Sequence, residues 1–285
     1  MMKKIIIAAH KPYAFAHDDL YLPLQVGAAG KKDILDLSTI YLKDGRAFGE
    51  TIMRDDIDDN ISEKNPTYCE LTGLYWAWKN LKDADVVGLV HYRRYFTVKS
   101  ATFQHGHDPY RCVLQEGELD NLLLQYDLLV PRKRIYGIET LYSHYAHTLD
   151  AYQLDAAKEI VEQSYPAYRG VIDRIYGRRW GYMFNMAIWQ RSDLEDYCQW
   201  LFEILGVLEK RLTEEGYLDG LSDFEKRLFG RVSEILFNVW VERKRLDGCR
   251  IGEVPVLYIE SENWPKKVKS FLAAKFARKK YGESF

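Results

Sequence analysis

The chain has 285 residues, of which 47% are hydrophobic, enough for one large α/β domain or one domain with an appended helical part. Its 40 basic and 42 acidic residues leave a formal net charge of −2, which excludes the strong positive field that gathers nucleic acid. The four cysteines are scattered without a C-x-x-C pair, a pattern that argues against a disulfide framework and a structural zinc site.

The N-terminal segment lacks the pattern of a secretion signal. Only five apolar residues precede His10, fewer than the core of a signal peptide needs. No apolar run approaches the roughly 18 residues that span a bilayer. Together with the cysteine usage, this predicts a protein of the reducing cytoplasm.

The first two thirds of the sequence alternate between predicted strands and helices. Apolar runs predict buried strands over 5–9, 85–90, 127–130 and 184–189, and apolar residues at helical spacing predict a helix over 65–81. Such alternation is typical of a mostly parallel sheet that is covered by helices on both faces. The predicted fold class is therefore α/β.

The last third of the sequence has a helical pattern. Residues 192–195 and 222–225 both have the capping-box form, which predicts helices over roughly 193–214 and 223–243. The sequence contains no repeat, low-complexity stretch or Gly/Ser linker. We therefore expect a single domain over 1–262 with a helical C-terminal portion, followed by a tail over 263–285.

Basic residues directly follow two of the predicted strands. They are His10 and Lys11 after the first strand, and His91, Arg93 and Arg94 at the end of the second. Because ligands of parallel sheets bind beyond the carboxyl ends of the strands, we expect these residues at one common edge. Two adjacent guanidinium groups there would match the oxygens of a leaving diphosphate. Alternatively, the arginines pair with the acidic cluster over 55–59 or face water.

A polar loop precedes the predicted helix over 65–81. Its side chains that could hydrogen-bond a ribose or a base are Asp59, Asn60, Lys64 and Asn65, and a solvated loop is the alternative. Two D-x-D strings, 56–58 and 83–85, are weak matches to a clamp for a metal ion and a diphosphate. The second string precedes its strand and should lie at the opposite edge of the sheet. No metal site is predicted, although Mn²⁺ or Mg²⁺ stays open because cationic side chains and a metal ion both offset phosphate charge.

Two further polar residues are candidates for chemistry. Asn185, at the start of the fourth predicted strand, could bind sugar hydroxyls or cap the backbone. Glu234 shares one face of a predicted helix with Arg227, Arg231 and Asn238. It could be the general base that takes a proton from an acceptor hydroxyl, or the partner of Arg231 in a surface ion pair.

The C-terminal tail is basic and amphipathic. Residues 264–281 contain seven lysines or arginines and no acidic residue, with apolar residues at helical spacing. Such a segment adsorbs to anionic lipid. A solvated terminal helix and a nucleic-acid arm are the alternatives.

Taken together, these segments resemble a family of capsular and exopolysaccharide glycosyltransferases that was long catalogued only as a domain of unknown function. The resemblance rests on the motifs Ala9-His10-Lys11-Pro12 and His91-Tyr92-Arg93-Arg94-Tyr95. The other matching segments are 21–27, 59–65, 70–80, 88–96, 139–145, 184–186, 197–202 and 230–234. These matches extend over nearly the whole chain. The sequence departs from the family pattern at two places. Asp58 stands where a glycine is expected in the loop before Asp59, and Ala187 and Trp189 stand where bulkier and more flexible residues are expected after Asn185-Met186.

The resemblance implies a GT-A-like nucleotide-binding fold and the transfer of a hexose from a UDP-sugar. The implied acceptor is a lipid-linked polysaccharide repeat unit at the inner face of the cytoplasmic membrane, and galactofuranosyl transfer is one activity attributed to the family. Site roles are implied for His10, Lys11, Asn60, Lys64, Asn65, His91, Arg93, Arg94, Asn185 and Glu234, which all lie within matching motifs.

Two other functions are alternatives to this one. A non-catalytic carbohydrate-binding or scaffold protein of the same assembly would keep the aromatic residues but would not need an arginine pair at a strand end. A phosphotransfer or nucleotide-sugar-modifying enzyme would need a glycine-rich phosphate loop, and residues 27–32 lack that spacing.

Overall fold

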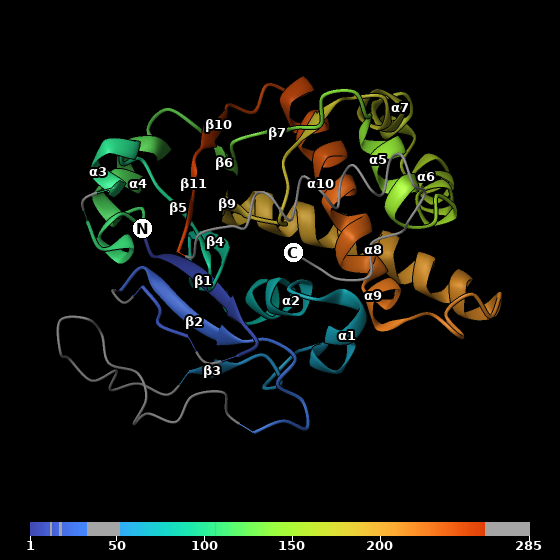
Figure 1. Ribbon diagram of the computed structural model, residues 1–285, viewed down its shortest axis with the longest axis horizontal. Helices are drawn as coiled ribbons and strands as arrows, with labels where there is room; N and C mark the ends of the chain where they lie inside the picture. The colour runs from blue at the N-terminus through green and yellow to red at the C-terminus, as the bar shows by residue number, and fades with distance from the viewer. Residues whose placement is uncertain (12, 17–18, 33–51, 106, 260–285) are drawn as a thin grey trace. The chain divides into compact units, whose positions relative to one another are not determined.

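The computed structural model describes residues 1–11, 13–16, 19–32, 52–105 and 107–259 (Figure 1). These residues form two compact units. The first unit contains the described residues within 1–132, 185–198 and 249–260, and the second those within 133–184 and 199–248. The single domain expected over 1–262 stays a prediction, and the basic tail over 263–285 lies outside the described residues.

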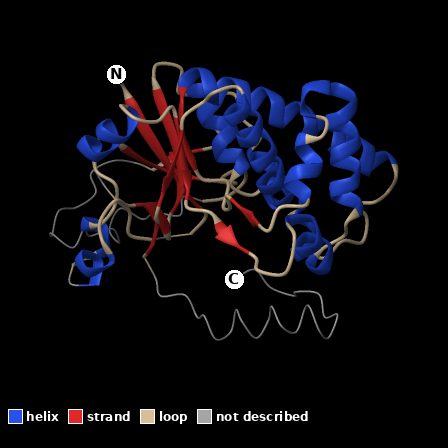
Figure 2. Cartoon of the chain, turned by 90° about the horizontal axis from the view of Figure 1, so that it is seen from above, coloured by secondary structure: helices blue, strands red, loops and turns tan. Residues whose placement is uncertain are grey.

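The first unit is built on one sheet, drawn in red in Figure 2. Its strands are β1 (Lys3–Ala9), β2 (Tyr21–Gln25), β3 (Met53–Arg54), β4 (Val86–His91), β5 (Arg94–Phe96), β6 (Leu128–Pro131), β9 (Ala187–Gln190), β10 (Ile251–Val254) and β11 (Val256–Tyr258). The order is β10-β6-β9-β4-β1-β2-β3, with β5 pairing both β4 and β11. Along this described path, four of the six pairings are parallel, which confirms the predicted α/β class.

The centre of this sheet is the most apolar part of the first unit. The side chains of Ile5, Ile6 and Ile7 are all fully buried in β1. β-branched residues suit a strand that is covered on both faces, because their restricted rotamers pack well on the pleated surface. The predicted strands over 5–9, 85–90 and 127–130 correspond to β1, β4 and β6 and are confirmed.

The fourth predicted strand is shorter than expected and runs the other way. β9 starts at Ala187 rather than Phe184 and pairs antiparallel with both β4 and β6. Phe184 and Asn185 have φ angles of 76° and 51°, in the left-handed region. A left-handed backbone cannot continue a strand, so the predicted start at Phe184 is wrong.

The helix predicted over 65–81 is interrupted. It consists of α1 (Asn65–Tyr68) and α2 (Leu71–Asn80), separated at Cys69, whose φ of 54° ends the first helix. The other helical segments that lie wholly in the first unit are η1 (Ser62–Lys64), α3 (Ala101–His105), η2 (Pro109–Arg111) and α4 (Glu116–Leu123).

The second unit is mainly helical, as predicted for the C-terminal portion. Its elements are β7 (Arg134–Ile135), α5 (Leu141–Thr148), α6 (Tyr152–Ser164), η3 (Pro166–Tyr168), α7 (Val171–Tyr176), β8 (Trp180–Gly181), α9 (Asp223–Lys226) and α10 (Leu228–Leu246). Helix α8 (Arg191–Glu214) begins in the first unit, continues in the second, and confirms the helix predicted over 193–214. The helix predicted over 223–243 is divided at Arg227, so its expected continuity is wrong.

Candidate functional site

The carboxyl ends of β1 and β4 lie side by side (Figure 1). The two strands are parallel and Ala8 pairs with His91, so the residues that follow each strand emerge at the same edge of the sheet. The structure thus brings His10 and Lys11 to the edge that holds His91 and the arginines, as the sequence predicted. Their roles in binding remain predictions.

A cation cluster forms at this edge around the ring of Tyr92, which is 5% exposed. The cluster consists of His10, Lys11 and Arg93. The His10 ring lies edge-on at 5.3 Å from the Tyr92 ring centroid, and Lys11 Nζ and Arg93 Cζ lie 5.6 and 5.1 Å from it. Lys11 and Arg93 are attracted to the ring as cations and His10 packs against it edge-on, so the buried ring holds the three groups near one another. The sequence analysis missed Tyr92 as the residue that organises this site.

The two arginines of the motif do not point to the same partner. Arg93 lies in the turn between β4 and β5, whereas Arg94 is the first residue of β5 and pairs with Tyr258 of β11. The guanidinium of Arg94 lies 5.8 Å from the Tyr258 ring centroid. Arg93 therefore belongs to the cation cluster, while Arg94 flanks it.

The polar loop before α1 is shaped by its own side chains. Asn60 donates from Nδ2 to the Asp58 carbonyl at 2.9 Å and accepts from the Ser62 amide at 3.1 Å. Asp59 accepts a hydrogen bond from Tyr75, and Lys64 lies 5.4 Å from the Tyr68 ring centroid. Asn60 and Asp59 thus stabilise the loop, whether or not they also contact a ligand.

Asp58 occupies a strained position in this loop. Its φ is 53°, a conformation that glycine adopts without steric cost. The backbone at Asp58 therefore has the left-handed conformation that the expected glycine would adopt. Aspartate tolerates this region better than most residues because its short side chain can hydrogen-bond locally.

A buried carboxylate that the sequence analysis did not select anchors the loop after β2. Asp55 is 0% exposed and accepts from the amides of Gly27 and Ala28 at 2.8 and 3.0 Å. It also accepts from the hydroxyls of Ser62 and Thr72. The sequence offered the acidic cluster over 55–59 as a partner for the arginines. Asp55 instead joins three segments of the first unit.

Asn65 lies against the backbone of the same loop. It donates from Nδ2 to the Cys69 carbonyl at 2.8 Å, and an added Cβ on Gly27 would lie 2.3 Å from its Oδ1. Gly27 also has a φ of 63°, so both its backbone angle and the close approach of Asn65 require glycine. Of the four loop residues predicted to bind a nucleotide, Asn65 is the one packed against the Gly27 turn.

Asn185 is held by a second acidic residue that was not predicted. Its Nδ2 donates to Glu70 Oε1 at 2.8 Å, and its side chain is 2% exposed. The hydrogen bond fixes the amide of Asn185 in its left-handed backbone conformation. This hydrogen bond orients the side chain of Asn185, and its predicted contact with sugar hydroxyls stays a prediction.

In the second unit, Glu234 and Asn238 of α10 hold the segment that precedes β9. Asn238 accepts from the Tyr182 amide at 2.7 Å and donates to the Tyr182 carbonyl at 2.8 Å. Glu234 Oε1 accepts from the Phe184 amide at 3.0 Å. The guanidinium of Arg231 lies 3.7 Å from the Phe224 ring centroid. Glu234 therefore has a structural contact, and its role as a general base stays a prediction.

Neither D-x-D string has the geometry of a metal clamp within the described residues. Asp56 forms an ion pair with Arg54 at 2.7 Å, and Asp85 accepts from the Met2 amide at the amino-terminal edge of the sheet. Nowhere in the described part of the chain do three or more His, Cys, Asp or Glu side chains gather as metal ligands. The basic side chains of His10, Lys11 and Arg93 lie at the opposite, carboxyl edge of the sheet.

Comparison with known proteins identifies the family. A model described as a domain of unknown function, DUF4422, matches residues 4–245, which is most of the chain. The chain belongs to the DUF4422 family. No curated protein matches its sequence significantly.

The fold of this DUF4422 chain is similar to that of a bifunctional glycosyltransferase of known structure, WbbM in its apo form. The TM-score is 0.77 and the identity 30%, and the match covers 92% of this chain but 46% of the WbbM chain. The chain thus spans about half the length of WbbM. Its α/β fold is GT-A-like.

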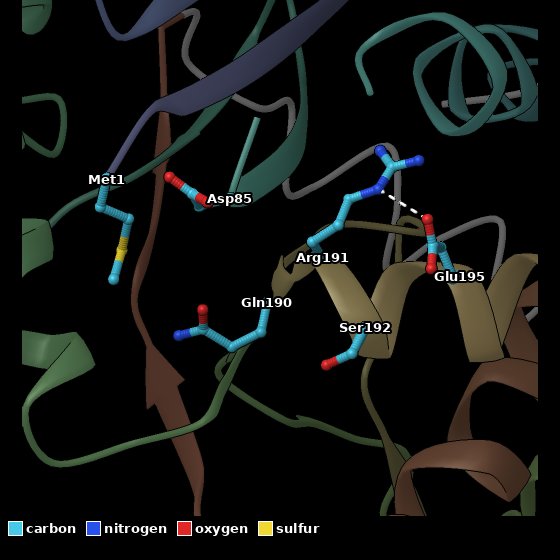
Figure 3. Close-up of a pocket in the computed structure, with 6 residues that line it drawn as sticks. All are labelled: Met1, Asp85, Gln190, Arg191, Ser192 and Glu195. Atoms are coloured by element: carbon cyan, nitrogen blue, oxygen red, sulfur yellow. Dashed lines mark hydrogen bonds and ion pairs between the residues drawn. The ribbon is translucent and has the colours of Figure 1, made fainter. Parts of the chain in front are cut away.

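An open hollow of about 550 Å³ lies at the other edge of the sheet (Figure 3). It is lined by Met1, Asp85, Gln190, Arg191, Ser192 and Glu195. The guanidinium of Arg191 is engaged by Glu195 and by the carbonyls of Trp78 and Leu81. This hollow of the DUF4422 chain is therefore distinct from the cation cluster at the carboxyl edge.

The buried carboxylate of Glu242 makes the stability of this DUF4422 chain dependent on pH. Its side chain is 3% exposed and accepts from Arg174, Arg178 and Arg245. Burial alone would raise the pKa of Glu242, but the hydrogen bonds from Arg245 and Arg178 outweigh it and lower the pKa to about 2. Because the folded pKa lies below the unfolded value, the stabilisation is complete above about pH 5 and is lost as the pH falls to about 2.

We expect Glu242→Gln to lower the free energy of unfolding at pH 7 by on the order of 3 kcal/mol. Urea unfolding at pH 7, 4 and 3 measures the difference from wild type, which should shrink with decreasing pH. Glu214→Gln is the matched control, because Glu214 is exposed and lies 3.9 Å from Lys210. A difference for Glu242→Gln that does not vary with pH would contradict the ion-pair explanation.

None of the helices in the described ranges combines the length and the apolar character of a membrane span.

Proposed function

We propose that the chain is a glycosyltransferase that moves a hexose from a UDP-sugar to a lipid-linked polysaccharide repeat unit. The proposal extends to capsule, exopolysaccharide or O-antigen synthesis and to galactose or galactofuranose as the sugar. The likeness to WbbM supports the reaction class, since that protein is a bifunctional glycosyltransferase. The inner face of the cytoplasmic membrane is the proposed place of action, because the proposed acceptor is lipid-linked.

The observation that carries the proposal is the cation cluster at the carboxyl ends of β1 and β4. His10, Lys11 and Arg93 meet around Tyr92, where ligands of such sheets bind. A departing UDP carries negative charge that grows as the glycosidic bond breaks. Positioned cations stabilise that charge more in the transition state than in the ground state, which accelerates transfer.

The remaining predicted residues receive roles in the same reaction. The loop that contains Asp59, Asn60, Lys64 and Asn65 would contact the ribose or the base, with its shape held by Asp55. Asn185 would orient the transferred sugar, and Glu234 would accept the proton of the attacking hydroxyl. A bound Mn²⁺ or Mg²⁺ would add charge compensation at the diphosphate.

Titration calorimetry with UDP and a panel of UDP-sugars tests the donor site, in parallel runs with MnCl₂ and with EDTA. We expect UDP to bind in both runs, because the cation cluster supplies positive charge without a metal ion. Hydrolysis or transfer assays with the same panel then identify the sugar. The absence of UDP binding in both runs would leave a carbohydrate-binding or scaffold protein as the remaining interpretation.

Removing one arginine of the motif tests the proposed contact of Arg93 and Arg94 with the leaving diphosphate. We expect Arg93→Ala or Arg94→Ala to cost about 2 to 4 kcal/mol of transition-state stabilisation, measured as the ratio of kcat/KM values. Lys82→Ala is the matched control, because it removes an exposed cation that precedes β4 at the other edge. Unchanged turnover in both arginine variants would refute their contact with the leaving group.

A further inference from the structure

The two-stranded ribbon of β7 and β8 in the second unit presents apolar side chains to solvent. Arg134 pairs with Gly181 and Ile135 with Trp180 in this two-stranded sheet. Ile135 is 73% exposed, and Ile138, in the turn that follows, is 65% exposed. A single exposed aliphatic residue is ordinary on a protein surface. Here two exposed isoleucines lie within four positions of one short segment.

The same ribbon carries a local excess of positive charge. Segments 133–138 and 177–182 contain Lys133, Arg134, Arg178 and Arg179 and no acidic residue. The nearest acidic residue in sequence, Glu139, is 3% exposed and hydrogen-bonded to His144 and His147. Glu242, which contacts Arg178, is shared with two other arginines. Arg178 is therefore paired with Glu242, and the exposed cations of the ribbon are Lys133, Arg134 and Arg179.

Aromatic rings lie in the same layer as these cations. Lys133 Nζ and Arg178 Cζ lie 5.1 and 4.1 Å from the centroid of the Trp180 ring, and Arg134 Cζ lies 5.4 Å from that of Tyr136. Trp180 also makes an edge contact with Tyr182 at 5.5 Å. Tyr136 and Tyr182 are buried, whereas Trp180 is half-buried. Tryptophan favours the boundary between lipid headgroups and acyl chains, where an apolar ring and a polar tip are both satisfied.

We propose that this basic ribbon, residues 133–138 and 178–180, binds the surface of a bilayer that contains anionic lipid. Lys133, Arg134 and Arg179 contact headgroup phosphates, while Ile135 and Ile138 enter the boundary with the acyl chains. The combination selects a bilayer, because a soluble polyanion would use the cations but not the isoleucines. The proposal does not depend on the proposed glycosyltransferase activity, and it concerns residues other than the C-terminal tail.

Sedimentation of the full chain with vesicles tests the proposal. Vesicles of phosphatidylcholine alone are compared with vesicles that also contain phosphatidylglycerol, without any nucleotide sugar. Lys133→Ser with Arg134→Ser should weaken binding to the anionic vesicles by about 30-fold, at about 1 kcal/mol for each cation. Ile135→Ser with Ile138→Ser should weaken it on the order of tenfold, because apolar area no longer leaves water.

Matched control variants show whether the loss of binding is specific to the ribbon or follows from any loss of surface charge or apolar area. Lys210→Ser with Lys226→Ser removes two other exposed lysines, and Leu124→Ser removes an aliphatic side chain that is 78% exposed. Both controls should bind as wild type does, and all variants should retain any hydrolysis of UDP-sugar in solution. Vesicle binding that the two ribbon variants leave unchanged overturns the proposal. Binding that falls with the cations but not with the isoleucines overturns the proposed entry of Ile135 and Ile138 into the bilayer.

Discussion

Glu234→Gln is expected to lower kcat for transfer to the acceptor by about 100- to 10,000-fold. Glutamine cannot take the proton from the attacking hydroxyl, yet its amide oxygen can still accept the hydrogen bond that the Phe184 amide donates at 3.0 Å. The substitution therefore removes the proposed base while it keeps the structural contact. Initial rates with saturating UDP-sugar and acceptor measure the effect, and the KM for the donor should change little.

Glu234→Ala separates the two roles of this carboxylate. Alanine removes both the base and the hydrogen bond that holds Phe184, whose φ of 76° needs support from its surroundings. If Glu234 is the base, both variants lose activity, and the acidic limb of the pH profile of kcat disappears with glutamine. If glutamine restores turnover that alanine abolishes, Glu234 only positions the backbone and the catalytic proposal is wrong.

Asp55→Ala is expected to lower the free energy of unfolding by about 3 to 5 kcal/mol. The carboxylate accepts from two amides and two hydroxyls in a fully buried position. Alanine leaves these donors in an apolar environment without an acceptor, and each unsatisfied buried group costs about 1 to 3 kcal/mol before relaxation. Urea unfolding followed by tryptophan fluorescence measures the loss.

The effect of Asp55→Ala should extend to the donor site, because Asp55 ties the Gly27 turn to Ser62 at the start of η1. We expect weaker UDP binding even at temperatures where the variant is fully folded. Asp83→Ala is the control, since this exposed residue precedes β4 and should change stability by less than about 0.5 kcal/mol. A loss below 1 kcal/mol for Asp55→Ala would show that the loop does not depend on the carboxylate.

The sequence analysis located the cation cluster because the information that places it is local. A short apolar run such as Ile5–Ile7 has few alternatives to a buried strand, and the basic residues directly follow such runs. Once two such strands are parallel neighbours, their carboxyl ends meet, and His10 must lie near His91. The long helix α8 was equally predictable, since the pattern of apolar residues repeats over its whole length.

Features that depend on distant partners could not be predicted in this way. Asp55 looks like one of several acidic loop residues, and its burial follows from Gly27, Ser62 and Thr72, which converge only in the fold. Nothing in the sequence of β9 indicates that it runs antiparallel, because hydropathy does not encode strand direction.

The sequence by itself determined the α/β class, the central strands and the basic edge, because apolar periodicity and the polarity of strand ends act over a few residues. Tertiary structure alone decided that Arg93 joins the cation cluster while Arg94 faces Tyr258, and that Glu70 holds Asn185. Each of these contacts depends on a hydrogen-bond donor, an acceptor or an aromatic ring that belongs to another segment of the chain. A buried polar group is stable only when such a partner is present.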